Sequence, residues 1–287
     1  MKKKLAILML CVPTFIFAQS TVISDGLKYC ESTYPYGEGI LVANFGTEQL
    51  NPLNSEGKGY IQYFHNGKSE VFIPADGNLS APKGMYIKDK HLFVCDVNKI
   101  VIYDMEDIKS DPVIVNMPEG NLFVNDLAAN EDNLYISVTN TDMVYVMNIS
   151  NPSNPGKPTP WLKVKGPNGL LLHEGKMFIA SYPADGNTSS ENIIYEVNDL
   201  EKPVAEKFIN VPGQYDGLAV SSDGNYIYVS GWDPAQVSRI KITDGTMETI
   251  EMNLKQKLVG PADISVKEGK IYIPDLPNSR VVVVNEQ

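Results

Sequence analysis

The chain has 287 residues, with 24 Lys and Arg against 35 Asp and Glu, and its formal net charge is −11 at pH 7. An acidic surface repels phosphate backbones, so we expect no nucleic-acid partner. No segment approaches the roughly 20 apolar residues that a membrane-spanning helix needs, so we expect no membrane span. The acidity is compatible with metal ions and small molecules, although solubility alone also accounts for it.

The N-terminus has the composition of a targeting segment. A basic start is followed by an apolar run over Leu5–Phe17 and by the small residue Ala18. This pattern predicts a secretory signal peptide over residues 1–18, cleaved to leave 269 residues (287 minus 18). We therefore expect an exported protein, periplasmic or secreted. Cys11 raises a lipoprotein alternative, but Leu10 precedes it where a small residue is expected, so cleavage near Ala18 is preferred.

The rest of the chain, residues 19–287, contains a unit that recurs six times. Each unit is anchored by a short apolar strand, and these strands are residues 40–44, 92–96, 134–138, 177–181, 227–231 and 271–275. A period of about 40 to 50 residues built from short strands predicts a propeller with one four-stranded blade per repeat. No helical period persists, so we expect an all-β fold, a six-bladed β-propeller forming a single domain.

The two ends of this domain are expected to complete one blade. The last repeat supplies three strands, beginning at Asp263, Lys270 and Arg280, where a blade needs four. Residues 21–29 precede the first repeat and resemble an isolated strand. We expect this N-terminal strand to join the last blade and close the ring, because it would cover edges that are otherwise open.

One position per repeat lies at the start of the first strand. It is found 13 residues before the end of each anchor strand, or 15 in the fifth repeat, where the turn is two residues longer. These positions are Glu31, Lys83, Asn125, Asn168, Asp216 and Ala262. The first strands of a propeller line its central channel, so these side chains should converge on the axis.

Four of the six positions carry oxygen: Glu31, Asn125, Asn168 and Asp216. Two carboxylates and two amide carbonyls suit a hard divalent cation, Ca²⁺ first and Mg²⁺ or Mn²⁺ next. Four ligands fall short of the roughly 6 to 8 that Ca²⁺ takes, which leaves positions for water and substrate. Taken singly, the Asn-Gly and Asp-Gly pairs could be ordinary turns. The common register across repeats favours a metal site.

Other residues should lie at the same end of the channel. Lys83 could place a cation near the metal or hold an anionic group of the substrate. Tyr182 and Trp232 follow second strands and either line the pocket or pack between blades. The insert Phe45–Lys58 is either a lid or a solvated loop, and the polar insert Pro183–Glu191 lies on the same side.

The cysteines and histidines indicate little chemistry. Export makes a disulfide between Cys30 and Cys95 possible, but α-carbons more than about 7 Å apart cannot be bridged, so two buried thiols are the alternative. The histidines, His65, His91 and His173, fall in hairpin turns, and no Ser-His-Asp set can be assembled.

The motifs Cys30-Glu31-Ser32, Asn125-Asp126, Pro167-Asn168-Gly169 and Tyr215-Asp216-Gly217 resemble those of the senescence marker protein/gluconolactonase (regucalcin-like) family. The resemblance covers the whole mature chain in order and blade number. It implies a six-bladed, calcium-dependent propeller hydrolase with a Glu, Asn, Asn, Asp calcium site. It also implies hydrolysis of a lactone or similar ester, in which the cation polarises the carbonyl and Asp216 orients or deprotonates the water. Asp216 and Asn125 would be the catalytic residues.

The chain departs from this family at Phe123. Gluconolactonases usually carry an Arg two residues before the blade-three Asn, where it holds substrate hydroxyls. With Phe123 in that part of the pocket, the departure argues against a sugar lactone more than against the metal. We expect an exported, divalent-metal-dependent hydrolase of a small lactone or ester, acting as a monomer on a small-molecule substrate. The alternative is a non-catalytic binding or scaffold propeller with a structural calcium ion in its channel.

Overall fold

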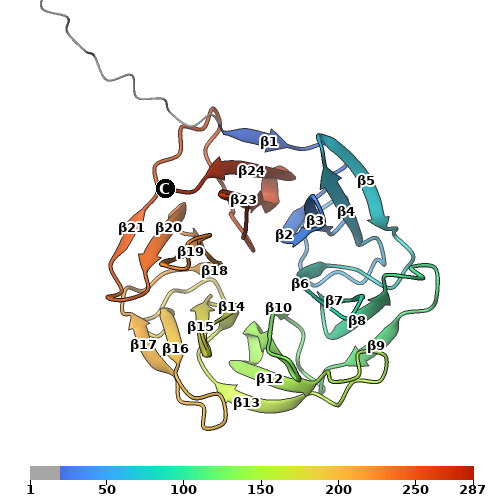
Figure 1. The fold of residues 1–287 in the computed structure, drawn as a ribbon, viewed down its shortest axis with the longest axis horizontal. Helices are drawn as coiled ribbons and strands as arrows, with labels where there is room; N and C mark the ends of the chain where they lie inside the picture. The colour runs from blue at the N-terminus through green and yellow to red at the C-terminus, as the bar shows by residue number, and fades with distance from the viewer. Residues whose placement is uncertain (1–19) are drawn as a thin grey trace, which may run out of the picture.

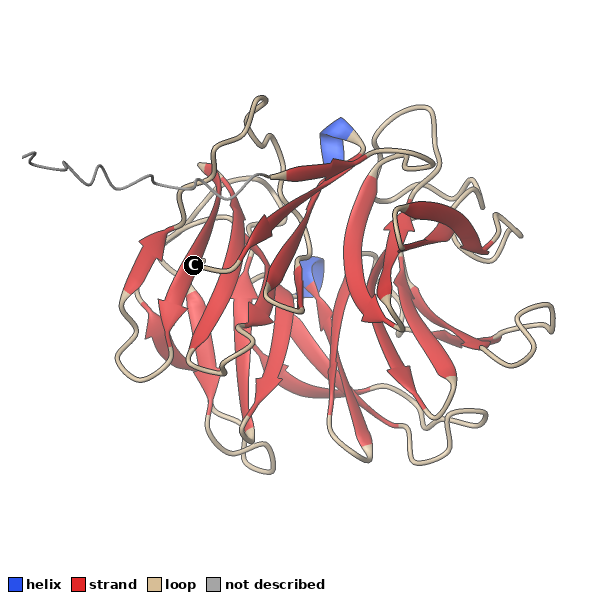
Figure 2. Ribbon diagram, turned by 45° about the horizontal axis from the view of Figure 1, so that its top comes forward, coloured by secondary structure: helices blue, strands red, loops and turns tan. Residues whose placement is uncertain are grey.

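The computed structural model describes residues 20–287, and the predicted signal peptide lies outside them. The described chain forms six four-stranded antiparallel sheets in a ring around a central channel (Figure 1). This is the all-β, six-bladed β-propeller that the repeats predict. Two short 3₁₀ helices, η1 (Thr139–Thr141) and η2 (Leu276–Asn278), complete the described elements (Figure 2). No helix within residues 20–287 has the length and apolar character needed to cross a membrane.

The first three blades follow one another in chain order, each strand hydrogen-bonded to the next. Blade one is β2 (Cys30–Tyr36), β3 (Gly39–Asn44), β4 (Tyr60–His65) and β5 (Lys68–Ile73). Blade two is β6 (Pro82–Lys88), β7 (His91–Asp96), β8 (Lys99–Asp104) and β9 (Val113–Asn116). Blade three is β10 (Val124–Ala129), β11 (Asn133–Val138), β12 (Met143–Asn148) and β13 (Thr159–Lys163).

The remaining blades complete the ring. Blade four is β14 (Pro167–His173), β15 (Lys176–Ser181), β16 (Ile194–Val197) and β17 (Glu206–Ile209). Blade five is β18 (Tyr215–Val220), β19 (Tyr226–Trp232), β20 (Ala235–Lys241) and β21 (Met247–Thr249). Blade six is β22 (Ser265–Lys267), β23 (Lys270–Asp275), β24 (Arg280–Asn285) and the N-terminal β1 (Thr21–Ile23).

The N-terminal strand closes the ring, as predicted. β1 pairs antiparallel with β24, Thr21 opposite Val283 and Ile23 opposite Val281, and the two strands lie side by side in Figure 1. Ile23 is buried with Cys30 of blade one, so the closure also contributes apolar contacts. The strand ends at Ile23, six residues earlier than expected from the sequence.

The core lies between neighbouring blades. Alternate residues of β7 face opposite neighbours: Leu92 and Val94 pack toward blade one, whereas Phe93 and Cys95 pack toward blade three. Because successive side chains of a strand point to opposite faces, a strand covered on both faces is apolar throughout. This burial explains why the second strand of each repeat was the most recognisable part of the sequence.

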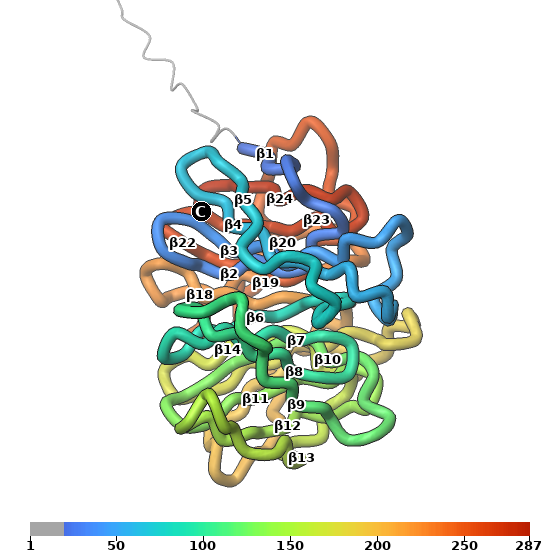
Figure 3. Tube along the Cα trace, turned by 90° about the vertical axis from the view of Figure 1, so that its right-hand side faces the viewer, coloured from blue at the N-terminus to red at the C-terminus, as the bar shows by residue number. Residues whose placement is uncertain are grey.

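Two inserts leave the ring at one end. The loop between β3 and β4 and the loop between β15 and β16 project on the same side, as the blue and yellow loops at the right of Figure 3 show. They correspond to the inserts Phe45–Lys58 and Pro183–Glu191. The end of the channel from which they project is therefore the one they can cover.

Candidate metal and substrate site

Five of the six residues predicted to converge on the axis lie in β-bulges. In blades one to five, the pairing of the first strand with its neighbour shifts by one residue, at Cys30/Ser32, Pro82/Met85, Val124/Leu127, Pro167/Leu170 and Tyr215/Leu218. In every case the predicted position falls inside the shift. A bulge releases one residue from the regular alternation and re-aims its side chain. The same local irregularity therefore recurs around the channel.

Blade six begins differently from the prediction. Its first strand was expected to start at Asp263, but β22 starts at Ser265. Pro261 and Asp263 form only isolated bridges, to Asp275 and to Ser32 of blade one. The Asp263 N–H donates to the Glu31 carbonyl at 2.9 Å, so this segment joins the two blades at the channel rather than continuing the sheet.

Glycine follows the predicted position where the first strands approach most closely. A β-carbon on Gly169 would come within 2.2 Å of the Asp216 carbonyl oxygen, and one on Gly217 within 2.5 Å of the Ile264 nitrogen. Asn168-Gly169 and Asp216-Gly217 therefore lie within β14 and β18, not in turns. Glycine is needed there because neighbouring backbones come too close for any side chain.

All eight residues proposed for metal or substrate binding line one cavity of about 380 Å³. These are Glu31, Asn125, Asn168, Asp216, Lys83, Phe123, Tyr182 and Trp232. The cavity is also lined by Phe45, Leu50 and Pro52 of the blade-one insert, by Pro183, Ala184 and Gly186 of the blade-four insert, and by Leu276. Both inserts are thus part of the cavity wall.

The four oxygen-bearing residues share an unusual property. Each is at most 5% exposed, and each has one oxygen without a hydrogen-bond partner among the described residues. The atoms are Glu31 Oε2, Asn125 Oδ1, Asn168 Oδ1 and Asp216 Oδ1. Buried polar atoms are almost always paired, so four unpaired oxygens in one cavity require a partner from outside the chain. Two carboxylates and two amides fit a hard cation.

Two of these side chains, Asp216 and Asn125, are held by hydrogen bonds through their other polar atom. Asp216 Oδ2 accepts a hydrogen bond from Trp232 Nε1 at 2.9 Å. The Asn125 amide donates to Thr139 Oγ1 at 3.5 Å, and Thr139 donates in turn to the Pro167 carbonyl at 2.9 Å. These contacts fix the orientation of the Asp216 and Asn125 side chains, whose remaining oxygens are the unpaired ones.

The site is electrostatically unfavourable for two carboxylates without added positive charge. Burial raises the pKa of Asp216 to about 7, against the hydrogen bond from Trp232, which lowers it. Burial and then the repulsion of Asp216 raise the pKa of Glu31 well above its ordinary value, while Lys83 opposes the shift. A divalent cation among these oxygens would favour their ionised forms.

Among residues 20–287, Lys83 is the only cationic residue that lines the cavity, and it is 1% exposed. Its Nζ donates to the Pro52 carbonyl at 3.2 Å and to the Ala81 carbonyl at 3.1 Å. The same atom lies 5.6 Å from the Phe45 ring centroid and 5.1 Å from that of Phe123. The ammonium therefore ties the blade-one insert to the channel and is flanked by aromatic rings.

Trp232 and Tyr182 line the cavity and also contact each other. Their rings meet edge to face, with centroids 6.1 Å apart. A β-carbon on Gly260 would come within 2.9 Å of the Trp232 ring, so a glycine provides the space in which the indole lies. The sequence left open whether these aromatics line the pocket or pack between blades; the structure places both on the cavity wall.

Sequence reasoning gave no role to Asp126 and Asp263. Both are buried and line a second cavity of about 220 Å³. Asp126 accepts the backbone N–H groups of Leu127 and Leu170, each at 2.7 Å, and Asp263 accepts the Ser32 hydroxyl at 2.5 Å. Each follows directly after the residue of its repeat that was predicted to face the channel, Asn125 or Ala262. This shared position in the repeat is the sequence signal that could have identified them.

The cysteines and histidines lie elsewhere. Cys30 and Cys95 are both buried and free, so the alternative of two buried thiols is the one observed. Burial raises the pKa of each thiol, which keeps it protonated and unreactive. None of the three histidines lines the candidate cavity. His91 contacts the Ser153 hydroxyl at 2.9 Å in an exposed hairpin.

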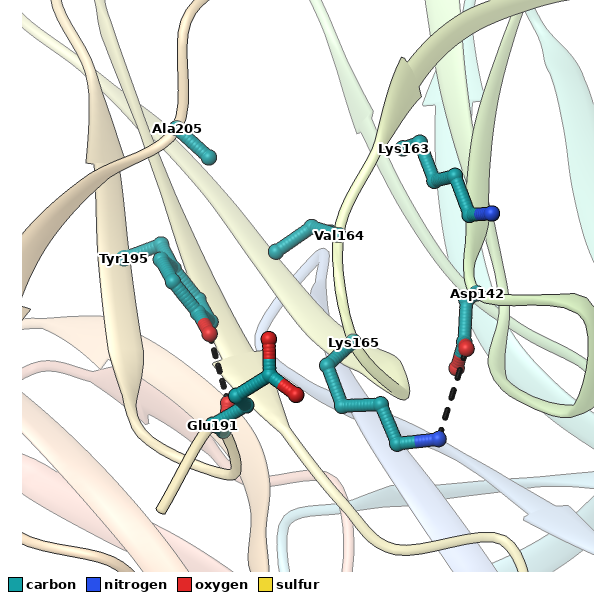
Figure 4. A pocket seen from close by; sticks show the side chains of 7 residues that line it. All are labelled: Asp142, Lys163, Val164, Lys165, Glu191, Tyr195 and Ala205. Atoms are coloured by element: carbon teal, nitrogen blue, oxygen red, sulfur yellow. Dashed lines mark hydrogen bonds and ion pairs between the residues drawn. The ribbon is translucent and has the colours of Figure 1, made fainter. Parts of the chain in front are cut away.

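Another cavity, of about 470 Å³, lies between blades three and four (Figure 4). Two of its charged groups form an ion pair, with Lys165 Nζ 3.3 Å from Asp142 Oδ2, and the Tyr195 hydroxyl donates to the Glu191 backbone carbonyl at 2.6 Å. It contains none of the unpaired buried oxygens. Within residues 20–287, no group of three or more His, Cys, Asp and Glu side chains is placed to bind a metal, so the candidate set depends on its two amides.

The fold and this cavity define a class of protein: a six-bladed β-propeller with a small-molecule-sized site at one mouth of its channel.

No protein-family model and no curated protein matches the chain. Among solved structures, a gluconolactonase from Xanthomonas campestris matches with a TM-score of 0.68 and 14% identity, covering 93% of this chain and 89% of its own. A Bacteroides thetaiotaomicron protein of unknown function matches with a TM-score of 0.63 and 14% identity, covering 90% and 70%. The chain therefore has a gluconolactonase-like propeller fold.

Proposed function

We propose that this protein is an exported, divalent-metal-dependent hydrolase of a small lactone or ester. The observation that carries the proposal is the set of four buried, unpaired oxygens contributed to one cavity by blades one, three, four and five. The fold of a gluconolactonase is consistent with this chemistry. Export rests on the sequence of residues 1–18, and we expect a monomer acting on a small molecule.

Glu31, Asn125, Asn168 and Asp216 would hold the cation through their unpaired oxygens, Ca²⁺ first and Mg²⁺ or Mn²⁺ next. When bound, the cation would supply a Lewis acid that polarises the carbonyl of the substrate. Four protein ligands leave coordination positions for other molecules. The donor set contains no soft ligand, so zinc and copper fit it less well.

Asp216 is the residue best placed to handle the attacking water. The hydrogen bond from Trp232 fixes one carboxylate oxygen, and the other belongs to the cavity. A carboxylate held in this way can orient a water molecule and accept its proton. Asn125, whose amide nitrogen donates to Thr139, has its unpaired carbonyl oxygen in the same cavity. The aromatic and aliphatic wall limits access of bulk water to the reacting groups.

The first experiment measures the metal content of the purified protein and its lactone and ester hydrolysis before and after chelation. Bound Ca²⁺ with turnover lost on chelation would support the proposal. The variant Asp216→Asn should be folded, retain measurable metal and be inactive. Asp111→Asn, at an exposed position of blade two, removes the same charge and should keep full activity. Absence of any bound metal would contradict the proposal.

A structural metal ion is the competing function. The four candidate ligands come from four blades, so an ion among them would cross-link the ring and stabilise it. In that case Asp216→Asn would lower the melting temperature without abolishing any reaction. Calcium without turnover across a panel of lactones and esters would favour this scaffold role.

A further inference from the structure

We infer that the substrate of this site is an apolar lactone or ester with an alkyl or aryl group, not a polyhydroxylated sugar lactone. The inference rests on the proposed function and names the substrate class for the same cavity. It follows from the contrast between the polar floor of the cavity and its apolar wall.

The wall above the four oxygens offers almost no hydrogen-bonding groups. Seven of its side chains are wholly apolar: Phe45, Leu50, Pro52, Phe123, Pro183, Ala184 and Leu276. Trp232 has one donor, but its N–H is already used by Asp216. Two donors of Lys83 are used by backbone carbonyls. The third donor of Lys83 and the Tyr182 hydroxyl are the side-chain donors of the wall that are left for a substrate hydroxyl. Burial raises the pKa of that hydroxyl to about 12, so it is a neutral donor.

Such a wall penalises hydroxyls on the ligand. A polar group that leaves water without finding a partner loses binding free energy, whereas an apolar group gains it. A hydrophobic pocket disfavours one added hydroxyl by about a hundredfold. A sugar lactone carries several hydroxyls, so its disadvantage should be at least that large.

Leu50 shows where an apolar ligand would be covered. It lies in the blade-one insert, lines the cavity and is 38% exposed. Phe45, at the start of the same insert, is fully buried and flanks Lys83. The insert therefore presents an apolar side chain at the mouth of the cavity and is anchored beneath it. A cavity of about 380 Å³ is at the small end of the range for ligand sites, which suits a compact lactone with a short side chain.

The test compares kcat/KM for δ-lactones that differ only in alkyl length, from no side chain to five carbons, with that for δ-gluconolactone. We expect a rise of roughly three- to fourfold per added methylene until the cavity is filled. We expect δ-gluconolactone to be at least about a hundredfold poorer than the best alkyl lactone.

A matched pair of variants in the insert locates the effect. Leu50→Asn replaces the exposed apolar side chain at the cavity and should reduce the gain per methylene. Leu53→Asn makes the same change three residues away, at a side chain that is 46% exposed and does not line the cavity, and should leave the series unchanged. Equal effects of the two substitutions would contradict the inference.

The outcomes separate the substrate class from the proposed function. Faster turnover of δ-gluconolactone than of every alkyl lactone would overturn the inference and leave the hydrolase proposal standing. If the protein hydrolyses neither class of lactone, the hydrolase proposal is contradicted. The inference about the substrate class is then tested by ligand binding. In a Trp161→Phe background, Trp232 is the only tryptophan, and its fluorescence should be changed by 5-hydroxydecanoate at lower concentration than by gluconate. No such preference would overturn the inference.

Discussion

The indole N–H of Trp232 donates a 2.9 Å hydrogen bond to Oδ2 of Asp216. The bond joins the end of β19 to the bulge of β18, and it leaves Asp216 Oδ1 as the carboxylate oxygen without a partner. It also lowers the pKa of this buried carboxyl, which burial raises. Trp232, a residue of the cavity wall, thus positions Asp216, which we propose binds the metal and activates the water.

Replacing Trp232 with Phe should weaken metal binding while retaining most of the apolar wall. The substitution removes the donor and frees Asp216 to rotate, and loss of such a supporting hydrogen bond typically costs about 10- to 100-fold in metal affinity. Calcium affinity is measured by calorimetric titration. Trp161→Phe is the control, because Trp161 donates to the Leu200 carbonyl on the outer side of the ring. An unchanged affinity in the Trp232 variant would contradict the positioning role.

Lys83→Met should have opposite effects on the metal-free and metal-bound protein. Without metal, Glu31 loses the positive charge that opposes the rise in its pKa, so the melting temperature should fall. With metal, removal of a neighbouring positive charge should raise calcium affinity by about tenfold or more.

The control for Lys83 is Lys90→Met, which makes the same change in net charge at an exposed lysine paired with Glu106. The Lys90 substitution should change the melting temperature and the calcium affinity only slightly. The Lys83 variant should also increase hydrogen exchange in the blade-one insert, because the Pro52 carbonyl loses its partner. A fall in calcium affinity would show that Lys83 supports the cation in some other way.

Ile23→Ala should destabilise the propeller although Ile23 is the last residue of a three-residue strand. Its side chain is 5% exposed and packs between blades six and one, so its truncation should cost about 2 to 5 kcal/mol. Val22→Ala, at a neighbouring side chain that is 49% exposed, should cost much less. Urea unfolding measures both. Similar stabilities for the two variants, or no loss on deleting residues 21–28, would contradict closure of the ring by β1.

Asp275→Asn should destabilise the protein at neutral pH and much less in acid. Burial acts to raise the pKa of Asp275, but hydrogen bonds from Asn278, Gly260, Val259 and Arg280 outweigh it and lower the pKa overall. A lowered carboxyl pKa stabilises the folded state above the unfolded value of about 3.9. That stabilisation is lost as the pH falls from there through the folded pKa.

The measurement is the difference in unfolding free energy between Asp275→Asn and the unsubstituted protein from pH 7 down to pH 3. At neutral pH the buried contact with Arg280 should make the variant about 3 to 5 kcal/mol less stable. The difference should shrink below about pH 4. Asp111→Asn, at an exposed carboxyl, provides a baseline. A difference that is independent of pH would show that the carboxylate charge is not what stabilises the fold.

The sequence by itself determined the number of blades, the closure of the ring and the set of four oxygens. These properties depend on a pattern that recurs at a fixed period, and a repeated strand is recognisable because both of its faces are buried. Three strands in the last repeat and an isolated one at the start were sufficient to predict the pairing of β1 with β24. Equivalent positions in repeats of known period must also lie at equivalent places in a ring.

Only the tertiary structure decided how those positions become a cavity. Three features depend on how neighbouring strands meet. They are the bulges at Asn168 and Asp216, the close approach of two blades that excludes a side chain at Gly169, and the hydrogen bond from Trp232 to Asp216. Two strand ends were also predicted wrongly. After Ile23 the chain forms a turn, in which the Leu27 N–H donates to the Ser24 carbonyl, and at Asp263 a bridge to blade one replaces the regular ladder. Local sequence specifies which residues form strands, but the distances between strands depend on the packing of all six blades.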